Sequence, residues 1–281
     1  MAATTAAREA VFSPSVASTS ASSSRVMRTV YDLLPPMTRE QAVDALTLAA
    51  AGFASAGIAW VQDAWVEPDT MQTWLVGAEA GAMTFRANLA WLAEPEGRWR
   101  EVLPALSDLK ARVDASAPEH LTAHTVKFFA DGILEGGTAA VLEPYCDCPT
   151  SHGIPNWTRE ELLEAVAECV RLGFQPHIHA IGDAGVRTAL DAFEHAIAVH
   201  GTANNPVMAH CQLVDPADLD RFRQLGVIAN FEPLWAQLEA EQTVYLCSCG
   251  ASAKKPFCDG SHLQLSSSTP KVQRPWWKLW A

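Results

Sequence analysis

The sequence predicts an α/β fold built on a parallel β-sheet, and three observations lead to this prediction. Short apolar runs recur between residues 58 and 231, and helical patterns fill the intervals between them. These intervals are long enough for the crossover connections that parallel strands require. About six strands are expected, which is fewer than the eight strands that close a (β/α) barrel.

The expected strands are short and apolar, which is typical of strands buried on both faces of a parallel sheet. They are residues 58–61, 83–89, 125–129, 176–179, 206–209 and 227–231.

Several helices show start and stop signals. Thr38 is a suitable N-cap for the first helix, which we expect to end near Gly57. Thr158 and Glu161 have the spacing of a capping box at a later helix start. The expected helices include 39–56, 159–172, 184–200 and 216–225.

The composition limits the kinds of partner that the protein can have. The 281 residues are 49% hydrophobic and give a formal net charge of -12. Nucleic acid is not an expected partner, because phosphate binding requires an excess of Lys and Arg. No apolar run reaches the roughly 18 residues that a membrane-spanning helix needs, so a soluble protein without a transmembrane segment is expected.

Three domains are expected: 1–30, 31–240 and 241–281. The first is rich in Ala, Ser and Thr, and we expect it to be a disordered leader. Its Arg content and single acid, Glu9, are also typical of an organellar transit peptide. The compartment is then a mitochondrion or plastid, whereas an untargeted leader implies the cytoplasm. The last domain reverses the charge of the chain, with five basic residues against one acid from Tyr245 onward and a basic aromatic end.

The chain has seven cysteines, which is an odd number, and they are unevenly distributed along the sequence. A secreted disulfide framework is therefore not expected, and an intracellular location is expected instead. Cys146 and Cys148, near His152, are interpreted as two free thiols in a loop. Three others, Cys247, Cys249 and Cys258, precede His262 within one short segment.

Three thiolates and one imidazole form a complete ligand set for a metal. From ligand chemistry alone, a Cys3His zinc site competes with an iron–sulfur cluster. The Cys247-Ser-Cys249 spacing departs from the Cys-x2–4-Cys knuckles of structural zinc sites and favours iron–sulfur.

Residues 247–262 also resemble the CDGSH iron–sulfur domain, the mitoNEET-like family. The defined positions of its signature are matched, including Ser252 and Pro256. The resemblance implies a [2Fe-2S] cluster with Cys247 and Cys249 on one iron and Cys258 and His262 on the other. It further implies a redox or cluster-acceptor protein as partner and a homodimer formed through this domain.

A second group of candidate ligands follows the strands of the larger domain. His177 and His179 are spaced i, i+2, so both side chains face one side of a strand and could reach one metal. His210 ends the next expected strand, and Lys127 lies on an earlier one. Parallel barrels keep their chemistry at the carboxyl ends of strands.

These segments resemble the metal-dependent amidohydrolases, in the branch of N-substituted formamide deformylase. The matching segments are 57–64, 126–132, 177–183, 208–213 and 227–235. The resemblance implies a TIM barrel with Lys127 as a bridging, carboxylated ligand and with His179 and His210 as metal ligands. It also implies a divalent metal such as zinc and hydrolysis of C–N bonds by metal-activated water.

Two features of that family are not matched. Its first strand ends in His-x-His, and no His occurs here before His120. Its eighth strand supplies an Asp as general base, and here the chain continues into Glu239-Ala-Glu and the cysteines. The expected fold is therefore an incomplete TIM-type barrel that lacks the first and eighth strands and is followed by a small, loop-rich CDGSH domain.

Two functions follow. The first is electron or cluster transfer by a [2Fe-2S] protein on a remnant amidohydrolase barrel. The alternative is a metal-dependent amidohydrolase with an iron–sulfur appendage. No catalytic residue is assigned, and whether the chain is an enzyme is left open. A third interpretation is a fused or mispredicted gene product.

One prediction concerns acid. An imidazole must be neutral to bind a metal, so protons compete for His262, and the ordinary pKa of histidine is about 6.5. A cluster at this site is expected to be lost as the pH falls below about 6, the range in which such a ring becomes protonated. His262→Cys should make the visible absorption stable to acid and lower the reduction potential. If both properties are the same in that variant, His262 is not a ligand.

Overall fold

The structure is a computed structural model that describes residues 33, 35 and 37–231. The chain divides into two compact units, Met1–Pro233 and Leu234–Ala281, and the described residues belong to the first. Strands alternate with helices along this unit. In chain order the elements are α3 (Arg39–Ser55), β1 (Trp60–Val66), α4 (Pro68–Glu79), β2 (Arg86–Leu92), α5 (Trp99–Ser116), β3 (Leu121–Phe129), α6 (Arg159–Arg171), β4 (Gln175–Ala180), α7 (Asp183–His200), β5 (Val207–His210), the 3-10 helix η2 (Pro216–Asp218), α8 (Leu219–Gln224) and β6 (Ile228–Asn230).

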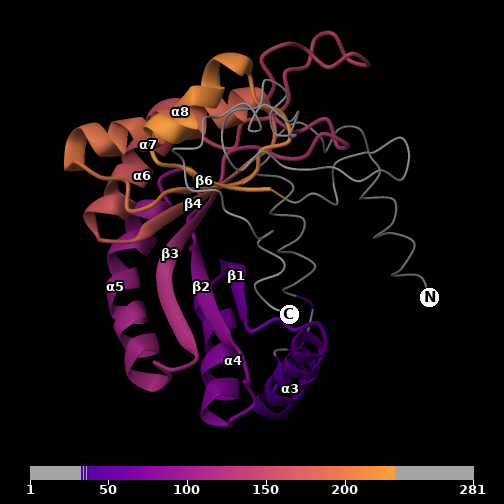
Figure 1. Cartoon of the computed structure of the whole chain (residues 1–281), viewed down its shortest axis with the longest axis vertical. Coiled ribbons are helices and arrows are strands. Elements are labelled where there is room, and N and C mark those ends of the chain that lie inside the picture. The colour runs from indigo at the N-terminus through magenta and orange to yellow at the C-terminus, as the bar shows by residue number, and fades with distance from the viewer. Residues whose placement is uncertain (1–32, 34, 36, 232–281) are drawn as a thin grey trace, which may run out of the picture. The chain divides into compact units, whose positions relative to one another are not determined.

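The strands form one parallel sheet in the order β1-β2-β3-β4-β5-β6 (Figure 1). The sheet curls into a half-barrel of six strands, as expected for an incomplete TIM-type barrel. The predicted α/β class and parallel sheet are therefore confirmed. Among the described residues, no helix is both long and apolar enough to cross a membrane.

The curl of the sheet is visible in one hydrogen bond. Gln62 lies in β1 and His177 in β4, and β2 and β3 separate these strands in the sheet. In a flat sheet the two strands would lie about 14 Å apart, because neighbouring strands are about 4.8 Å apart. The Gln62 Nε2 and His177 Nδ1 atoms are nevertheless only 2.6 Å apart. The two side chains therefore reach toward each other across the concave face.

The two faces of the sheet differ in chemistry. One face presents apolar side chains such as Leu89, Trp91, Phe128 and Ile178, each at most 1% exposed. Figure 1 shows α5, α6 and α7 on one side of the strands, with α5 beside β3 and with α6 and α7 beside β4. The other face is polar, and the register places Lys127 opposite His177 on it. The candidate ligands therefore lie on the face that does not hold the apolar core.

The two predicted helix-start caps have different outcomes. Thr38 is the N-cap of α3, and its capping-box partner is Gln41. At α6 only half of the predicted capping box forms. Thr158 Oγ1 accepts from the Glu161 amide, but the Glu161 carboxylate accepts from the Gly97 amide instead. A tertiary contact has therefore displaced the local one.

The remaining helices differ from the sequence analysis in two ways. The predicted helix 216–225 is two elements, the 3-10 helix η2 and then α8. Helices α4 and α5 lie in intervals where helical patterns were expected, but their bounds were not predicted. Their N-cap residues, Glu67 and Arg98, make no side-chain capping hydrogen bond, so the Ser, Thr, Asp or Asn cap that marks a helix start is missing from the sequence.

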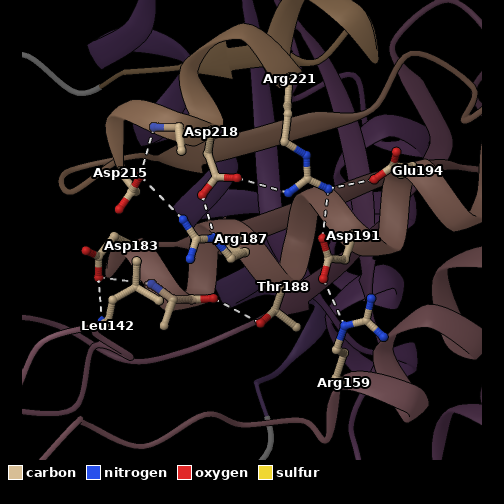
Figure 2. A network of polar contacts seen from close by, with 12 residues as sticks. Leu142, Arg159, Asp183, Arg187, Thr188, Asp191, Glu194, Asp215, Asp218 and Arg221 are labelled. Atoms are coloured by element: carbon tan, nitrogen blue, oxygen red, sulfur yellow. Dashed lines mark hydrogen bonds and ion pairs between the residues drawn. The ribbon is translucent and has the colours of Figure 1, made fainter.

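An ion-pair network holds the η2–α8 connection against α7 (Figure 2). Asp218 is 3% exposed and accepts hydrogen bonds from Arg187 Nε at 2.8 Å and Arg221 Nη1 at 3.0 Å. Arg221 also donates to Asp191 and Glu194 on α7. Removing one partner of such a pair leaves an uncompensated buried charge. The network therefore fixes the segment that leads from β5 into β6.

Two helical glycines provide a matched test of packing. In α7, a Cβ at Gly185 would lie 2.5 Å from Oδ2 of the buried Asp131, whereas in α3 a Cβ at Gly52 would meet nothing within 4 Å. Gly52→Ala should stabilise the fold by roughly 0.5–1 kcal/mol, because alanine loses less backbone entropy on folding. Gly185→Ala should destabilise it by about 1–3 kcal/mol through overpacking.

Urea unfolding of the full chain, followed by circular dichroism, would measure both effects. The two changes in the free energy of unfolding need not be equal in size. A Gly185→Ala variant as stable as the parent would contradict the close approach to Asp131.

Candidate functional site

The register of β3 and β4 brings three of the candidate side chains to one face. Lys127 pairs with His177, and two residues further along Phe129 pairs with His179. Because side chains alternate along a strand, these four residues share a face. Lys127, His177 and His179 are 2%, 5% and 6% exposed, so the group is buried. The i, i+2 spacing of the two histidines has the geometry that the sequence predicts.

His210 is directed toward the same site by an unusual backbone conformation, not by the alternation of side chains along its strand. It pairs with Ala180 on the apolar face, so alternation alone would point it away from His179. Its backbone has φ 77°, and Cys211 follows with φ 48°, both in the left-handed region that side chains other than glycine rarely adopt. The His210 and His179 rings lie 4.6 Å apart between centroids, edge to face. The unusual backbone at the end of β5 thus accompanies a histidine directed toward the site.

Strained backbone of this kind persists only where the surrounding structure holds it in place, and it concentrates at functional sites. Here the Cys211 amide donates to the Ala180 carbonyl at 3.0 Å, which ties the turn after β5 to the end of β4.

His177 is held from two sides. Its Nδ1 is 2.6 Å from Gln62 Nε2, and its Nε2 is 3.4 Å from Lys127 Nζ. Burial lowers the pKa of His177 to about 3, and the nearby charge of Lys127 adds to the effect. The ring is therefore neutral near pH 7, and the amide of Gln62 donates to its Nδ1.

The polar groups beneath this pair are also satisfied. Asn88 Nδ2 donates to Thr125 Oγ1 at 2.8 Å and approaches Gln62 Oε1 at 3.5 Å. Thr125 in turn donates to Gln175 Oε1 at 3.1 Å. A satisfied network of buried polar groups holds its members in one arrangement. It links β1 to β4 across the concave face.

His179 is the most firmly positioned of the candidate ligands. Its Nε2 lies 2.9 Å from the carbonyl oxygen of Gly132, which can only accept, so Nε2 bears the proton. Nδ1 is then left with its lone pair. Burial lowers the pKa of His179 to about 4, so the ring is neutral at pH 7. A neutral imidazole fixed by a carbonyl is the usual form of a histidine ligand.

Asp131 is a site residue to which the sequence reasoning assigned no role. Its Oδ1 accepts from the Ile181 amide at 3.0 Å, and its Oδ2 accepts from the Gly182 and Ala140 amides at 2.8 and 2.9 Å. Oδ1 is also 3.5 Å from His179 Nε2. Burial raises the pKa of Asp131 to about 6, and the three amide donors oppose that rise.

The signal for this residue was present in the sequence. Asp131 lies two residues after the end of β3 and precedes a glycine, Gly182 is the N-cap of α7, and Gly185 lies in the first turn of that helix. Acids at strand ends beside glycine-rich turns commonly accept backbone N–H groups. Asp183, the first residue of α7, repeats the pattern by accepting from the Leu142 amide at 2.8 Å.

The donor set fits a divalent metal only if Lys127 is modified. Among the described residues, no group of three or more His, Cys, Asp or Glu side chains could hold a metal ion. His179 and His210 supply two imidazoles. A lysine ammonium has no lone pair, whereas a carbamate on Lys127 would supply carboxylate oxygen and complete a set of three.

The other sequence predictions have different outcomes. Cys146 and Cys148 are exposed and free, as interpreted, and His152 Nδ1 pairs with the Val141 carbonyl at 3.1 Å. The predicted cluster ligands Cys247, Cys249, Cys258 and His262 lie outside the described residues, as does the leader 1–30. Those predictions therefore stand as predictions.

Comparison with known proteins assigns the family. The model of an amidohydrolase family matches residues 19–246, which is most of the chain and ends one residue before Cys247. The matched range includes residues 19–30 of the predicted leader.

Two curated proteins are similar to shorter stretches. Protein LONG AFTER FAR-RED 3 of Arabidopsis thaliana is 33% identical over 129 residues, which is 46% of this chain and 22% of that protein. The putative amidohydrolase YtcJ of Bacillus subtilis is 28% identical over 163 residues, 58% of this chain and 28% of that protein. The match thus spans less than a third of either relative.

The fold also has a solved counterpart. The crystal structure of an uncharacterized metal-dependent hydrolase from Pyrococcus furiosus is similar with a TM-score of 0.62 and 25% sequence identity. The similarity covers 74% of this chain and 41% of that one. With a family model that matches well over half of its residues, and with strands that bring Lys127, His179 and His210 toward one face, the chain belongs to the amidohydrolase family.

Proposed function

We propose that the carboxyl ends of β3, β4 and β5 form a divalent metal site for the hydrolysis of an amide C–N bond. The observation that carries the proposal is the pair of neighbouring imidazoles, His179 and His210, whose ring centroids are 4.6 Å apart on adjacent strands. Lys127 lies on the same face of the sheet, is 2% exposed, and has its Nζ 3.4 Å from His177 Nε2.

The proposed ligands are His179, His210 and Lys127 carrying a carbamate. The carbamate forms when the neutral lysine amine attacks CO2, which makes an N–C bond and releases one proton to water. The carbamate oxygens then replace the lysine nitrogen as the atoms that bind the metal. A hard, oxygen-containing set with two imidazoles suits zinc or a similar divalent ion.

A bound divalent cation supplies Lewis-acid polarisation of the amide carbonyl and activation of water. The protein residues do the positioning. Asp131 and the Gly132 carbonyl hold His179, and Gln62 holds His177 beside Lys127. The description of the Pyrococcus furiosus protein as a metal-dependent hydrolase supports the same assignment.

The three proposed ligands account for one divalent metal ion. The first-strand His-x-His pair that would bind a second ion is not matched, because no histidine precedes His120. The Asp expected on an eighth strand is not matched either, so we assign no general base. The proposal is therefore limited to the one metal ion that the three described ligands can hold.

Zinc binding and amide hydrolysis test this proposal together. The full chain, prepared with zinc and bicarbonate, should bind one zinc per chain by elemental analysis and hydrolyse N-acyl or N-formyl amides. His179→Ala removes a ligand, so it should weaken zinc binding by at least the roughly 10- to 100-fold that loss of an outer partner costs. Hydrolysis should fall to background.

His124→Ala is the matched control, because His124 lies on β3 with Lys127 but is exposed. It should bind zinc like the parent. Equal zinc affinity in the His179→Ala variant, or equal hydrolysis by metal-free protein, would overturn the proposal.

We also propose a [2Fe-2S] cluster at Cys247, Cys249, Cys258 and His262, with a redox or cluster-acceptor protein as partner and a homodimer formed through this domain. The spacing of the four ligands supports it. The four proposed ligands lie outside the range that matches the amidohydrolase family, which ends at residue 246.

Iron and sulfide analysis of the purified chain, with an absorption spectrum, tests the cluster. Two irons and two sulfides per chain with visible absorption are expected. Zinc without sulfide at these four residues would replace the cluster with a Cys3His zinc site.

A further inference from the structure

Strand β1 contains a β-bulge close to the site. Before it, Asp63 pairs with Leu89 of β2; after it, Val66 pairs with Trp91. Three steps along β1 therefore oppose two steps along β2, and the alternation of side chains changes phase. Asp63 and Val66 both lie on the apolar face with Leu89 and Trp91. Trp65, between them, is turned to the polar face that holds Lys127 and the histidines.

The bulge is held by specific contacts. Asp63 Oδ1 accepts a hydrogen bond from the Trp65 amide at 3.2 Å, and Asp63 Oδ2 accepts one from Trp74 Nε1 at 2.9 Å. Trp74 lies on α4, so this helix holds the Asp63 carboxylate that in turn binds the Trp65 amide in the bulge of β1. Bulges beside active sites commonly redirect a side chain in this way.

The redirected ring joins a series of aromatic contacts that leads to the proposed metal ligands. The Trp65 and Phe129 ring centroids are 5.1 Å apart, and so are those of Phe129 and His179. Lys127 Nζ lies 4.9 Å from the Phe129 ring. Trp65 itself is 52% exposed, so about half of its surface is open at the outer end of this series.

We propose that Trp65 is a substrate-contacting residue that selects amides with a planar apolar substituent. Its exposed ring packs against that substituent while the scissile bond lies nearer the histidines. Aromatic rings stack on one another with centroid separations of about 4.5–7 Å, so Trp65 can accept a ring on its open side as it accepts Phe129 on the other. The inference rests on the proposed function for the position of the scissile bond, but not for the binding itself.

Equilibrium binding tests the contact without any reaction. Saturation-transfer NMR on the full, metal-free chain would give Kd values for N-phenylacetamide and N-methylacetamide. Trp65→Ala should weaken binding of N-phenylacetamide by about tenfold, the order expected for loss of an aromatic stack and its buried area. Trp65→Phe should restore most of that affinity. N-methylacetamide should be bound weakly by all variants alike.

Trp60→Ala is the matched control. Trp60 is on the same strand and is 56% exposed, but it lies at the amino end of β1, away from the proposed ligands. It should bind N-phenylacetamide like the parent. The proposal is overturned if Trp65→Ala has no effect on this Kd, or if Trp60→Ala weakens it equally.

Hydrolysis measured in parallel separates this inference from the proposed function. Trp65-dependent binding of N-phenylacetamide without hydrolysis of any amide would remove the proposed function and support the binding site. Hydrolysis of both amides with the same kcat/KM in the parent and in Trp65→Ala would support the proposed function and remove the role of Trp65.

Discussion

The buried carboxylate of Asp131 is the interaction on which the candidate site depends. Its two oxygens accept from three backbone amides, of Ala140, Ile181 and Gly182. These amides belong to the loop after β3 and to the turn between β4 and α7, so one side chain joins segments that no strand pairing connects. A charge this deeply buried is costly unless it is fully hydrogen-bonded, and here the backbone supplies the bonds. The orientation of His179 follows, because its Nε2 faces Asp131 and the Gly132 carbonyl.

Much of the fold could be predicted because its signals are local. Alternating apolar runs and helical patterns indicate a parallel sheet, and Thr38 and Thr158 mark two helix starts through side-chain caps. His177 and His179 could also be placed on one face, because period-two alternation determines it. Lys127 joins them through the register of β3 with β4, which the sequence pattern does not contain. The bounds of helices α4 and α5 were not predicted, because no N-cap side chain marks where they start.

The rest of the site depends on contacts that sequence periodicity does not contain. His210 would point to the apolar face if β5 kept its alternation, and the left-handed backbone at its end reverses that outcome. Trp65 reaches the site face only because a bulge shifts the phase of β1. Glu161 leaves its own helix start to bind the Gly97 amide. In each case a tertiary contact or a local irregularity overrides a rule that holds along a regular element.

The hydrogen bond between Gln62 and His177 has a consequence for how the protein folds. These residues are separated by 115 positions in the chain, and their contact crosses the concave face from β1 to β4. Contacts between residues so far apart require the closure of a long loop and slow the formation of native structure. The surroundings of Lys127 are therefore completed only when four strands have assembled and curled. A partly folded chain can contain regular helices and still lack the chemical environment of the site.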